Sequence, residues 1–592
     1  MIAANRLFDL LTLNNEKQFI PDLLATKENG TWKKYSNREV RELVNELSAG
    51  LLSLGLGNGD GSYEGKDKIA IIAKNRPEWI MFDLAIQQIG AVLTPIYPTI
   101  NINELQFILA DAKVKLIIVN DESLYNKVFS IKDQLPELNY IYSLDPTTDG
   151  LQWKTLLNKE DALHQKVQSI SATINETDLA TIIYTSGTTG KPKGVMLSHH
   201  NILSNVIDST PCFPKINNSK ALSFLPLNHI FERMITYLYL YNGTSIYYAE
   251  SLDTIADNLR EIKPQLFTTV PRLLEKVYEK IMMKGSELRG IKKQIFFWAH
   301  RLAANYDIHE SKGFIYKLQI SIADKLVFSK WREALGNNII CIVSGGAACQ
   351  VRLIKIFGAA KLVILEGYGL TETSPVISVN RMEEIDRYFG SVGPLIRNVE
   401  VKIADDGEIL CKGPNIMLGY YKNEALTSET IENGWYKTGD IGELIKGRFL
   451  KITDRKKEIF KTSGGKYVAP MIIENKFKES RYIENIIVIG ASRKFVSALI
   501  IPSFTNLQLW CKEHNIDYSS NEAIIKNNEV LNFYSKLVDE YNENFNHVEQ
   551  IKKFELLDKE WNVENGELTP KLSLKRKIIE ERYIENINRI YS

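Results

Sequence analysis

Short apolar runs recur along the chain between stretches of helical character, and this alternation constrains the fold more than any other feature. Residues 68–73, 116–119 and 362–365 are rich in branched side chains and bounded by polar residues. Runs of this kind are typical of strands buried on both faces of a parallel sheet. The stretches 39–54 and 79–89 predict amphipathic helices between them. The sequence therefore predicts an α/β protein.

The length of the chain predicts more than one domain. Its 592 residues exceed what a single core accommodates. The last part has strand-like runs of its own, 485–490 and 497–501, followed by a highly charged helical tail. We place the boundary in the charged run 453–458, which gives domains of residues 1–453 and 454–592. The first is predicted to be a large α/β domain in subdomains, and the second a small α+β domain.

Composition excludes several classes of protein. Lys and Arg number 73 and Asp and Glu 72, so no overall charge favours nucleic acid or membrane. The five cysteines are odd in number and no pair is spaced C-x-x-C, which argues against a disulfide framework or a zinc site. No signal peptide and no spanning segment of about 18–20 apolar residues is expected. The predicted location is cytoplasmic, or at most peripheral on the inner face of a membrane.

One region has a local charge excess. Residues 276–332 hold 12 Lys or Arg and 5 Asp or Glu, with Phe296, Phe297 and Trp298 among them. The simpler interpretation is a set of solvated helical faces with a buried aromatic stripe. The alternative is a basic amphipathic patch that contacts anionic lipid or the phosphates of a nucleotide ligand.

The sharpest motif is Tyr184-Thr-Ser-Gly-Thr-Thr-Gly-Lys-Pro-Lys-Gly194, which follows an apolar run at 179–184. Its glycines permit unusual backbone conformations, and its hydroxyls and backbone N–H groups can surround phosphate oxygens. Lys191 and Lys193 add positive charge, and Ser198 is expected to cap the next helix. The run predicts a phosphate-binding loop made of Thr185, Ser186, Gly187, Thr188, Thr189, Gly190, Lys191 and Lys193.

Two competing nucleotide loops do not fit. In a Walker A loop four residues separate the glycines and Lys is followed by Ser or Thr, whereas Gly187 and Gly190 are three apart and Pro192 follows Lys191. Proline there removes an N–H and disfavours a helical turn. The glycines at 55–59 follow a helical pattern and lack G-x-G-x-x-G spacing, so a dinucleotide loop is discarded.

Further motifs follow in order. They are Leu225-Pro-Leu-Asn-His-Ile-Phe-Glu-Arg233, Ser344-Gly-Gly-Ala-Ala348, Glu366-Gly-Tyr-Gly-Leu-Thr-Glu-Thr373, Gly434-Trp-Tyr-Lys-Thr-Gly-Asp440, Asp454-Arg-Lys-Lys-Glu-Ile-Phe-Lys461 with Ser463-Gly-Gly-Lys-Tyr-Val-Ala-Pro470, and Leu568-Thr-Pro-Lys-Leu-Ser-Leu-Lys-Arg-Lys577. Together with the phosphate loop, they resemble the adenylate-forming superfamily of acyl-CoA synthetases, beetle luciferases and adenylation domains. Within it, the motif forms are similar to those of long-chain fatty acid–CoA ligases.

The resemblance implies roles for individual residues. The loop at 185–193 would hold the β- and γ-phosphates of ATP, His229 would line the junction of acyl and nucleotide sites, and Gly346 and Ala347 would lie beside adenine. The other implied roles are adenine stacking by Tyr368 with Gly369, an α-phosphate contact by Thr371, Mg²⁺ binding by Glu372, ribose contacts by Asp440 and Arg455, a hinge at Lys457, and a coenzyme A tunnel at Gly464 and Gly465.

The catalytic lysine of the family lies in the last motif, where this chain departs from the common pattern. The usual Gly-Lys ending is Leu574-Lys575 here, and Lys575 is five residues after Pro570. We assign Lys575, with Lys571 as the alternative. Catalytic residues are therefore predicted to be Lys575, His229, Thr371 and Glu372.

The implied activity is ATP-dependent activation of a carboxylic acid, predicted to be a long-chain fatty acid, as an acyl-adenylate, followed by transfer to coenzyme A. The resemblance also implies that the C-terminal domain is mobile and rotates about Lys457 between the two steps. Three alternatives stay open: a ligase that loads a carrier protein, a ligase for a medium-chain or aromatic acid, and an inactive lipid- or nucleotide-binding module. Intact Lys191, Glu372, Asp440, Arg455 and Lys575 argue against the last.

Overall fold

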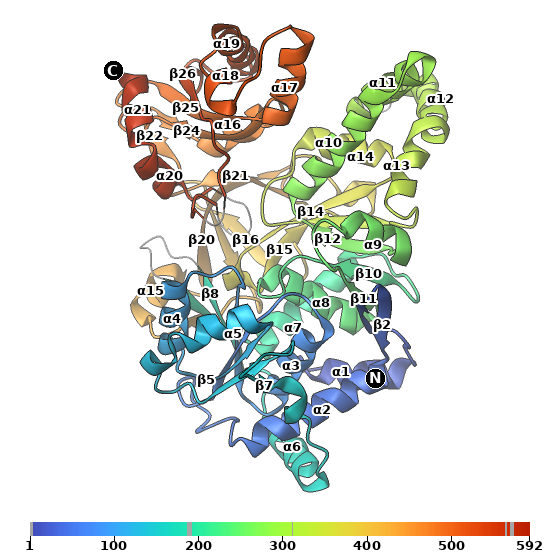
Figure 1. Cartoon of the computed structure of the whole chain (residues 1–592), viewed down its shortest axis with the longest axis vertical. Coiled ribbons are helices and arrows are strands. Elements are labelled where there is room, and N and C mark those ends of the chain that lie inside the picture. Colours follow the sequence, from blue (N-terminus) through green and yellow to red (C-terminus); the bar gives the residue numbers. More distant parts are fainter. Residues whose placement is uncertain (1–3, 186–191, 311, 563–564, 569–573) are drawn as a thin grey trace. The chain divides into compact units, whose positions relative to one another are not determined.

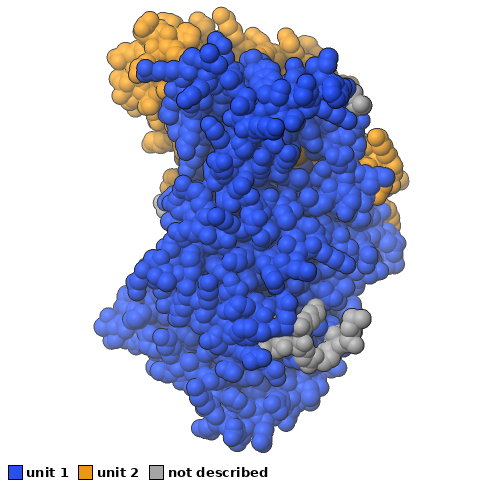
Figure 2. Space-filling model, turned by 90° about the vertical axis from the view of Figure 1, so that its right-hand side faces the viewer, with its two compact units in different colours: residues 1–346, 355–401, 411–437 blue, residues 347–354, 402–410, 438–592 orange. Residues whose placement is uncertain are grey.

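The structure, a computed structural model, describes residues 4–185, 192–310, 312–562, 565–568 and 574–592. The chain forms two compact units (Figure 2). Unit 1 comprises residues 1–346, 355–401 and 411–437, and unit 2 comprises residues 347–354, 402–410 and 438–592. The predicted α/β fold with a smaller C-terminal α+β part is confirmed by the sheets described below.

The first sheet of unit 1 is a mostly parallel sheet of eight strands (Figure 1). Two of the expected apolar runs form its centre, and the apolar run before the phosphate loop forms β8. In spatial order the strands are β18 (Gly419–Tyr420), β9 (Lys193–Ser198), β8 (Leu179–Thr185), β4 (Val92–Ile96), β3 (Lys68–Ile72), β5 (Val114–Val119), β6 (Tyr140–Ser143) and β7 (Leu151–Gln152).

The second sheet of unit 1 also has eight strands, parallel except at its two ends. The predicted strand at 362–365 lies in it as part of β14. In spatial order the strands are β15 (Val376–Val379), β14 (Val363–Gly369), β13 (Cys341–Ser344), β12 (Leu266–Thr269), β10 (Lys220–Ser223), β11 (Ser245–Tyr248), β1 (Leu24–Glu28) and β2 (Thr31–Tyr35).

Helices connect these strands. They are α1 (Asp9–Lys17), α2 (Asn37–Ser53), α3 (Pro77–Gln88), α4 (Ile102–Asp111), α5 (Glu122–Phe129), α6 (Asp161–Thr173), α7 (His199–Ser209), α8 (Ile230–Asn242), α9 (Ile255–Ile262), α10 (Pro271–Glu287), α11 (Gly290–Ala304), α12 (Gly313–Ala323), α13 (Ser329–Ala334), α14 (Val351–Ala359) and α15 (Glu424–Thr430). Ser198 caps α7 as expected, because its Oγ accepts the Asn201 N–H at 3.1 Å.

Helix α3 differs from its prediction. The stretch 79–89 was expected to be amphipathic, but every residue of α3 from Pro77 to Gln87 is buried. The helix packs against α2 and α6, so no face is left for solvent. Its polar residues Asp83 and Gln87 take part in a buried hydrogen-bond network. Sequence periodicity alone cannot distinguish polar residues in such a network from polar residues on a solvated face.

The C-terminal part of the chain has smaller sheets. Strands β16 (Glu400–Ile403), β17 (Glu408–Lys412), β20 (Trp435–Ile445) and β19 (Ile431–Glu432) form one sheet, with β21 (Phe449–Arg455) paired to β20. Unit 2 contains β24 (Ile483–Ile489), β25 (Val496–Pro502) and β26 (Ile551–Leu556), and the pair β22 (Phe460–Lys461) and β23 (Tyr467–Val468). The runs 485–490 and 497–501 are therefore strands as predicted.

Helices of unit 2 cover the three-stranded sheet and share one core with it. They are α16 (Pro470–Phe477), α17 (Phe504–Glu513), α18 (Asn521–Ile524), α19 (Asn528–Asn542), α20 (Arg576–Arg582) and α21 (Ile584–Tyr591). The last two form the charged helical tail.

A buried polar network fixes α8 against α3 and β8. The Arg233 guanidinium donates from Nε to Asp83 Oδ2 at 3.0 Å and from Nη1 to Thr181 Oγ1 at 2.8 Å. Tyr237 donates its hydroxyl to the same carboxylate. Arg233 and Asp83 are both fully buried, and the pair holds the strand that leads to the phosphate loop against the helix that begins after His229.

A second buried acid lies on the same helix. Glu232 accepts hydrogen bonds from the hydroxyls of Ser223 and Thr268. Burial raises the pKa of Glu232 to about 7, although the two hydroxyl donors oppose that shift. The carboxyl group is therefore protonated in the folded protein over a pH range in which it is ionised in the unfolded chain.

This difference predicts a pH dependence of stability. A raised pKa in the folded state contributes stability at pH values below the unfolded pKa of about 4.3, and that contribution is lost as pH rises to about 7. The loss is about 3–4 kcal/mol at this site. Glu232→Gln keeps the hydrogen-bonding shape and removes the titration. We expect unfolding midpoints of this variant, relative to wild type, to rise between pH 4 and pH 8; equal shifts at all pH values would contradict the assignment.

Residues 276–332 form α10 to α13 and the π-helical turn η4 (Asp324–Phe328). Part of the expected aromatic stripe is buried: Phe296 contacts Trp331 with ring centroids 6.2 Å apart, and Trp331 contacts Phe328 at 5.1 Å. Across the described part of the chain, no helix combines the length and the apolar character needed to cross a membrane.

Candidate active site

The phosphate loop is framed by two paired strands. β8 ends at Thr185 and β9 begins at Lys193, and these two residues are direct partners in the antiparallel register. The predicted Ser186, Gly187, Thr188, Thr189, Gly190 and Lys191 lie outside the described residues. Thr185 Oγ1 is buried and has no hydrogen-bond partner among the residues described. This suits a hydroxyl that donates a hydrogen bond to an oxygen of a ligand.

The Lys193 side chain lies between two groups from distant parts of the sequence. Its Nζ donates to Glu372 Oε1 at 2.8 Å and to the Tyr420 hydroxyl at 2.6 Å. The Tyr420 hydroxyl in turn donates to Glu372 Oε1 at 2.9 Å. The structure therefore brings together a predicted phosphate ligand and the predicted metal ligand, and adds a tyrosine.

The electrostatics of this cluster favour the ionised carboxylate. Burial alone would raise the pKa of Glu372, but the charge and the hydrogen bond of Lys193 outweigh it and hold the pKa below its ordinary value. Burial and the charge of Glu372 raise the pKa of Tyr420. Burial, with the charge of Glu372 next, raises that of Tyr436 well above its ordinary value. The site thus holds a buried anion beside a cation and two neutral phenols.

Buried amides fix the segment that carries Thr371 and Glu372. Asn415 Nδ2 donates to the Thr373 carbonyl at 2.8 Å, and Asn205 both donates to and accepts from the backbone of Val376. Ser374 adopts a φ of 66°, a left-handed conformation that costs energy for a residue other than glycine. Thr371 and Glu372 are both buried, so this turn is held in place before any ligand binds.

Tyr368 and Gly369 lie at the end of β14, next to that turn. Tyr368 pairs with Ser378 of β15, and the register shifts between Tyr368 and Gly369. A Cβ at Gly369 would lie 1.8 Å from the Pro375 carbonyl oxygen. Glycine is therefore required because two backbone segments approach closely here. The β-bulge between Tyr368 and Gly369 changes the direction of the strand at this point.

Two further motifs meet around Phe231. His229 caps α8, and its Nδ1 accepts the Phe231 N–H at 3.1 Å, so Nε2 is the nitrogen that can carry a proton in this arrangement. A Cβ at Gly345 would lie 3.1 Å from the Phe231 ring. The predicted Gly346 follows with a φ of 81°. The His229 and Gly346 motifs are thus neighbours in unit 1, whereas Ala347 belongs to unit 2.

The predicted ribose ligands face each other within unit 2. Asp440 on β20 and Arg455 on β21 are direct partners in the antiparallel ladder, and Arg455 Nε lies 3.5 Å from Asp440 Oδ1. Asp440 is buried and Arg455 is exposed. The carboxylate is therefore buried in the sheet, whereas the guanidinium stays accessible to solvent.

The predicted hinge follows directly after this pair. Lys457 is exposed in a turn, and its neighbour Lys456 is anchored at 2.6 Å to both Asp406 and Glu408. Gly464 and Gly465 lie in the next turn, where Gly465 has a φ of 74°. The anchored Lys456 provides a fixed point immediately before Lys457.

Lys575 is positioned by a neighbour that the sequence did not single out. It caps α20, and its backbone N–H donates to the Glu567 carbonyl at 2.8 Å. The next residue, Arg576, donates to Glu458 at 3.2 Å and also pairs with the buried Glu474. The alternative lysine, Lys571, lies outside the described residues.

Tyr420, Tyr436 and Arg576 are the site-forming residues that sequence reasoning missed. Tyr436 and Arg576 lie inside motifs already identified, so their positions in the sequence could have marked them as site residues. Nothing in the sequence marks Tyr420, because it reaches Glu372 only through the pairing of the two-residue strand β18 with β9, in which Tyr420 lies opposite Val195.

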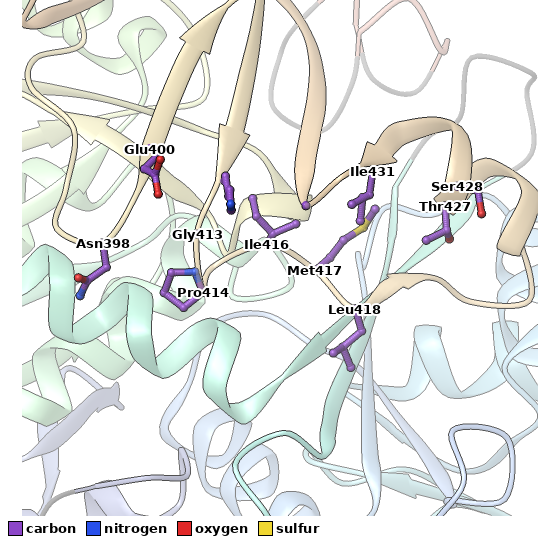
Figure 3. Close-up of a pocket in the computed structure, with 12 residues that line it drawn as sticks. Asn398, Glu400, Gly413, Pro414, Ile416, Met417, Leu418, Thr427, Ser428 and Ile431 are labelled. Carbon is purple, nitrogen blue, oxygen red and sulfur yellow. The ribbon is translucent and has the colours of Figure 1, made fainter.

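A pocket of about 670 Å³ lies beside this strand (Figure 3). Its lining residues are Asn398, Glu400, Lys412, Gly413, Pro414, Ile416, Met417, Leu418, Thr427, Ser428, Ile431 and Gly434. In the described regions, no site residue predicted from the sequence lines it. Its wall is nevertheless bonded to the site, because Met417 N–H donates to the Glu372 carbonyl at 2.9 Å and Tyr420 N–H donates to Thr427 Oγ1 at 2.9 Å.

The residues present fit a phosphate-bound Mg²⁺ rather than a metal held by protein alone. Within the described ranges, no group of three or more His, Cys, Asp or Glu side chains could hold a metal ion. Glu372 offers one ionised, buried carboxylate. Mg²⁺ keeps several waters and is commonly bound by one or two carboxylates together with substrate phosphates, and a single Glu372 beside the phosphate loop meets that requirement.

Comparison with known proteins gives consistent results for sequence and fold. Residues 15–421 match the family model of AMP-binding enzymes, and residues 457–592 match that of the AMP-binding enzyme C-terminal domain. The chain is 30% identical to the long-chain-fatty-acid–CoA ligase FadD15 of Mycobacterium bovis, over 95% of this chain and 93% of that protein. It is 30% identical to long chain acyl-CoA synthetase 3 of Arabidopsis thaliana, over 99% and 91%.

Solved structures show the same fold at lower identity. The crystal structure of the anthranilate CoA ligase AuaEII in complex with anthranoyl-AMP matches with a TM-score of 0.71 and 18% identity, covering 98% of this chain and 97% of that one. A fatty acyl CoA synthetase of Mycobacterium tuberculosis matches with a TM-score of 0.62 and 19% identity, covering 98% and 99%. With the motifs in order and Lys193 beside Glu372, the chain belongs to the AMP-binding enzyme family, in the group of long-chain fatty acid–CoA ligases.

Proposed function

We propose that the protein activates a long-chain fatty acid with ATP as an acyl-adenylate and transfers the acyl group to coenzyme A. The observation that supports this most is the Lys193–Glu372–Tyr420 cluster at the mouth of the phosphate loop. A loop cation that reaches a buried carboxylate suits an anionic leaving group with its metal. The chain length of the acid rests on the relatives named above.

In the first step a carboxylate oxygen of the acid attacks the α-phosphorus of ATP, and the bond to pyrophosphate breaks. Two anions must approach each other, so the protein acts mainly by positioning and by neutralising charge. Thr185, Lys193 and the loop between them hold the leaving group, Tyr368 stacks on adenine, and Thr371 contacts the α-phosphate. Mg²⁺ bound by Glu372 would offset phosphate charge.

In the second step the coenzyme A sulfur attacks the acyl carbonyl, AMP leaves with the electron pair of the acyl–oxygen bond, and the thiol proton is released. Asp440 and Arg455 hold the ribose in our proposal. Lys575, with Lys571 as the alternative, serves the first step, and the loop of Gly464 and Gly465 serves the second. One site then serves two reactions if residues 454–592 turn about Lys457 between them.

Pyrophosphate release tests the proposal directly. Purified protein is incubated with ATP, Mg²⁺ and a series of fatty acids, with and without coenzyme A. Release that depends on a long-chain acid, with acyl-CoA formed when coenzyme A is present, is the expected result. Acid-dependent release without acyl-CoA would indicate a carrier-protein acceptor. No release with any acid would overturn the proposal and favour a binding module.

Lys457→Pro tests the hinge. Proline fixes φ near −65° and removes the backbone N–H, so rotation at this residue is restricted. We expect adenylate formation to be retained and thioester formation to slow by on the order of tenfold or more, measured as separate half-reactions. Lys457→Ala, which keeps backbone freedom, is the control. An unimpaired overall rate for the proline variant would rule out a hinge at this position.

A further inference from the structure

An apolar helical face in unit 1 is exposed to solvent. On α12, Phe314 is 80% and Ile315 73% exposed, and Leu318 and Ile322 are also exposed. At 100° per residue these four side chains fall within an arc of about 100° on one side of the helix. We call them, with the exposed Leu326 of η4, the α12 face. Isolated exposed apolar residues are ordinary, but five on one continuous surface are not.

The α12 face belongs to a helical projection rather than to a sheet. Figure 1 shows α11 and α12 side by side, extending away from the sheets of unit 1, and the two helices contact each other. The opposite side of the projection is packed, because the Tyr316 hydroxyl donates to the Leu302 carbonyl at 2.9 Å and Ala323 is buried. More apolar side chains are exposed nearby, at Met283 and Leu288 before α11 and at Ile291 in its first turn.

Cations surround these apolar residues. Three of the five acidic groups between residues 276 and 332 are matched: Asp324 pairs with Arg332 and Lys361, Asp307 with Lys355, and Glu310 with Lys312. The other two, Glu279 and Glu287, are outnumbered by the unpaired cations. Ten exposed cations between residues 276 and 332 have no ion pair among the described residues: Lys276, Lys280, Lys284, Arg289, Lys292, Lys293, Arg301, Lys317, Lys325 and Lys330. The surface therefore combines apolar side chains with unmatched positive charge.

We propose that α11, α12 and η4 dock the protein on an anionic lipid surface, with the α12 face inserted among the acyl chains and the surrounding lysines on the headgroups. A helix with this pattern lies in the plane of the interface and does not span it. A nucleotide phosphate would explain the lysines but leaves Phe314 and Ile315 in water. A lipid surface accounts for both classes of side chain. The inference does not depend on the reaction proposed above.

Vesicle binding of the full chain tests the proposal. Co-sedimentation is measured with vesicles of phosphatidylcholine alone and of phosphatidylcholine mixed with phosphatidylglycerol, over a series of salt concentrations. We expect binding to the mixed vesicles that weakens as salt rises. No binding to mixed vesicles, or equal binding to neutral ones at all salt concentrations, would overturn it.

Two sets of substitutions separate the apolar and the ionic contributions. Phe314→Ser with Ile315→Ser should lower partitioning on the order of 100-fold, because burial of each side chain contributes a factor of about ten. Lys292→Gln, Lys293→Gln and Lys317→Gln together should also lower it on the order of 100-fold, since each cation near an anionic surface contributes a factor of about five.

Matched controls use the same changes elsewhere. Phe129→Ser with Leu252→Ser removes two other exposed apolar side chains, and Lys159→Gln, Lys526→Gln and Lys577→Gln removes three other exposed charges. Neither should alter binding, and thermal unfolding should match wild type throughout. If the serine variant binds vesicles as wild type does, the proposal fails. It also fails if light scattering shows a wild-type dimer that the serine variant converts to a monomer.

Discussion

Replacing Lys575 by alanine is expected to reduce adenylate formation by about 10²–10³-fold, the loss typical when one preorganised donor to a developing charge is removed. Its backbone is fixed at the start of α20 by the Glu567 carbonyl and by the anchored Arg576, so the side chain extends from a rigid base. Thioester formation from pre-made acyl-adenylate should be largely spared. The two half-reactions are measured separately, by pyrophosphate release and by acyl-CoA formation.

The control is Lys577→Ala, two residues further along the same helix. Lys577 is exposed and its nearest carboxylate, Glu581, is 4.0 Å away, so this variant should retain both half-reactions. Lys571→Ala decides between the two candidate lysines. Loss of adenylation in that variant, with Lys575→Ala active, would transfer the role to Lys571. Equal loss of both half-reactions in Lys575→Ala would show that the residue is not specific to the first step.

Arg233→Met is expected to destabilise the protein by about 3–5 kcal/mol, because it leaves the buried Asp83 carboxylate without its cation. Tyr237 and Gln87 still donate to Asp83, but neither carries charge. The expected result is a lower unfolding midpoint and a lower soluble yield, measured by thermal and denaturant unfolding. Because the network joins α8 to β8, we also expect ATP binding to weaken in whatever folded protein remains.

A double variant distinguishes an uncompensated charge from lost packing. Asp83→Asn with Arg233→Met removes both charges and should recover at least half of the lost stability. Arg260→Ala is the surface control, since Arg260 and its partner Asp257 are both mostly exposed, and it should change stability by less than about 1 kcal/mol. If the double variant were no more stable than Arg233→Met, the buried charge would not be the cause.

Local sequence patterns predicted the strands well and one helix poorly. The runs at 68–73, 116–119 and 497–501 form β3, β5 and β25. A strand buried on both faces needs a short run of branched apolar residues, and such a run can be recognised from its own sequence alone. The polar residues of α3 suggested a solvated face instead. Asp83 is satisfied by Arg233, 150 residues away, and no local pattern reports such a partner.

The residues of the candidate site show the same difference between local patterns and long-range contacts. Lys193 and Glu372 were predicted because each lies in a recognisable motif that comes shortly after an apolar run. Their contact joins two different sheets, and no local pattern predicts it. Tyr420 was missed because its place depends on pairing between β18 and β9, which are more than 200 residues apart. Arg576 was missed because its role is to form a largely buried ion pair with Glu474. Charged residues are usually exposed, so the sequence gives no reason to expect this pair.

The brevity of β18 bears on how this enzyme tolerates insertions and deletions. On this side β9 is paired with two residues of β18, Gly419 and Tyr420. Hydrogen bonds from Asn415 and Met417 to the Thr371–Thr373 turn fix the chain just before them, so the number of residues between these two attachments is set. Adding or removing one residue between 417 and 419 would shift the pairing by one position and turn the phenol of Tyr420 to the other face of the sheet. Homologues and engineered variants should therefore change length freely at surface loops but keep this spacing constant.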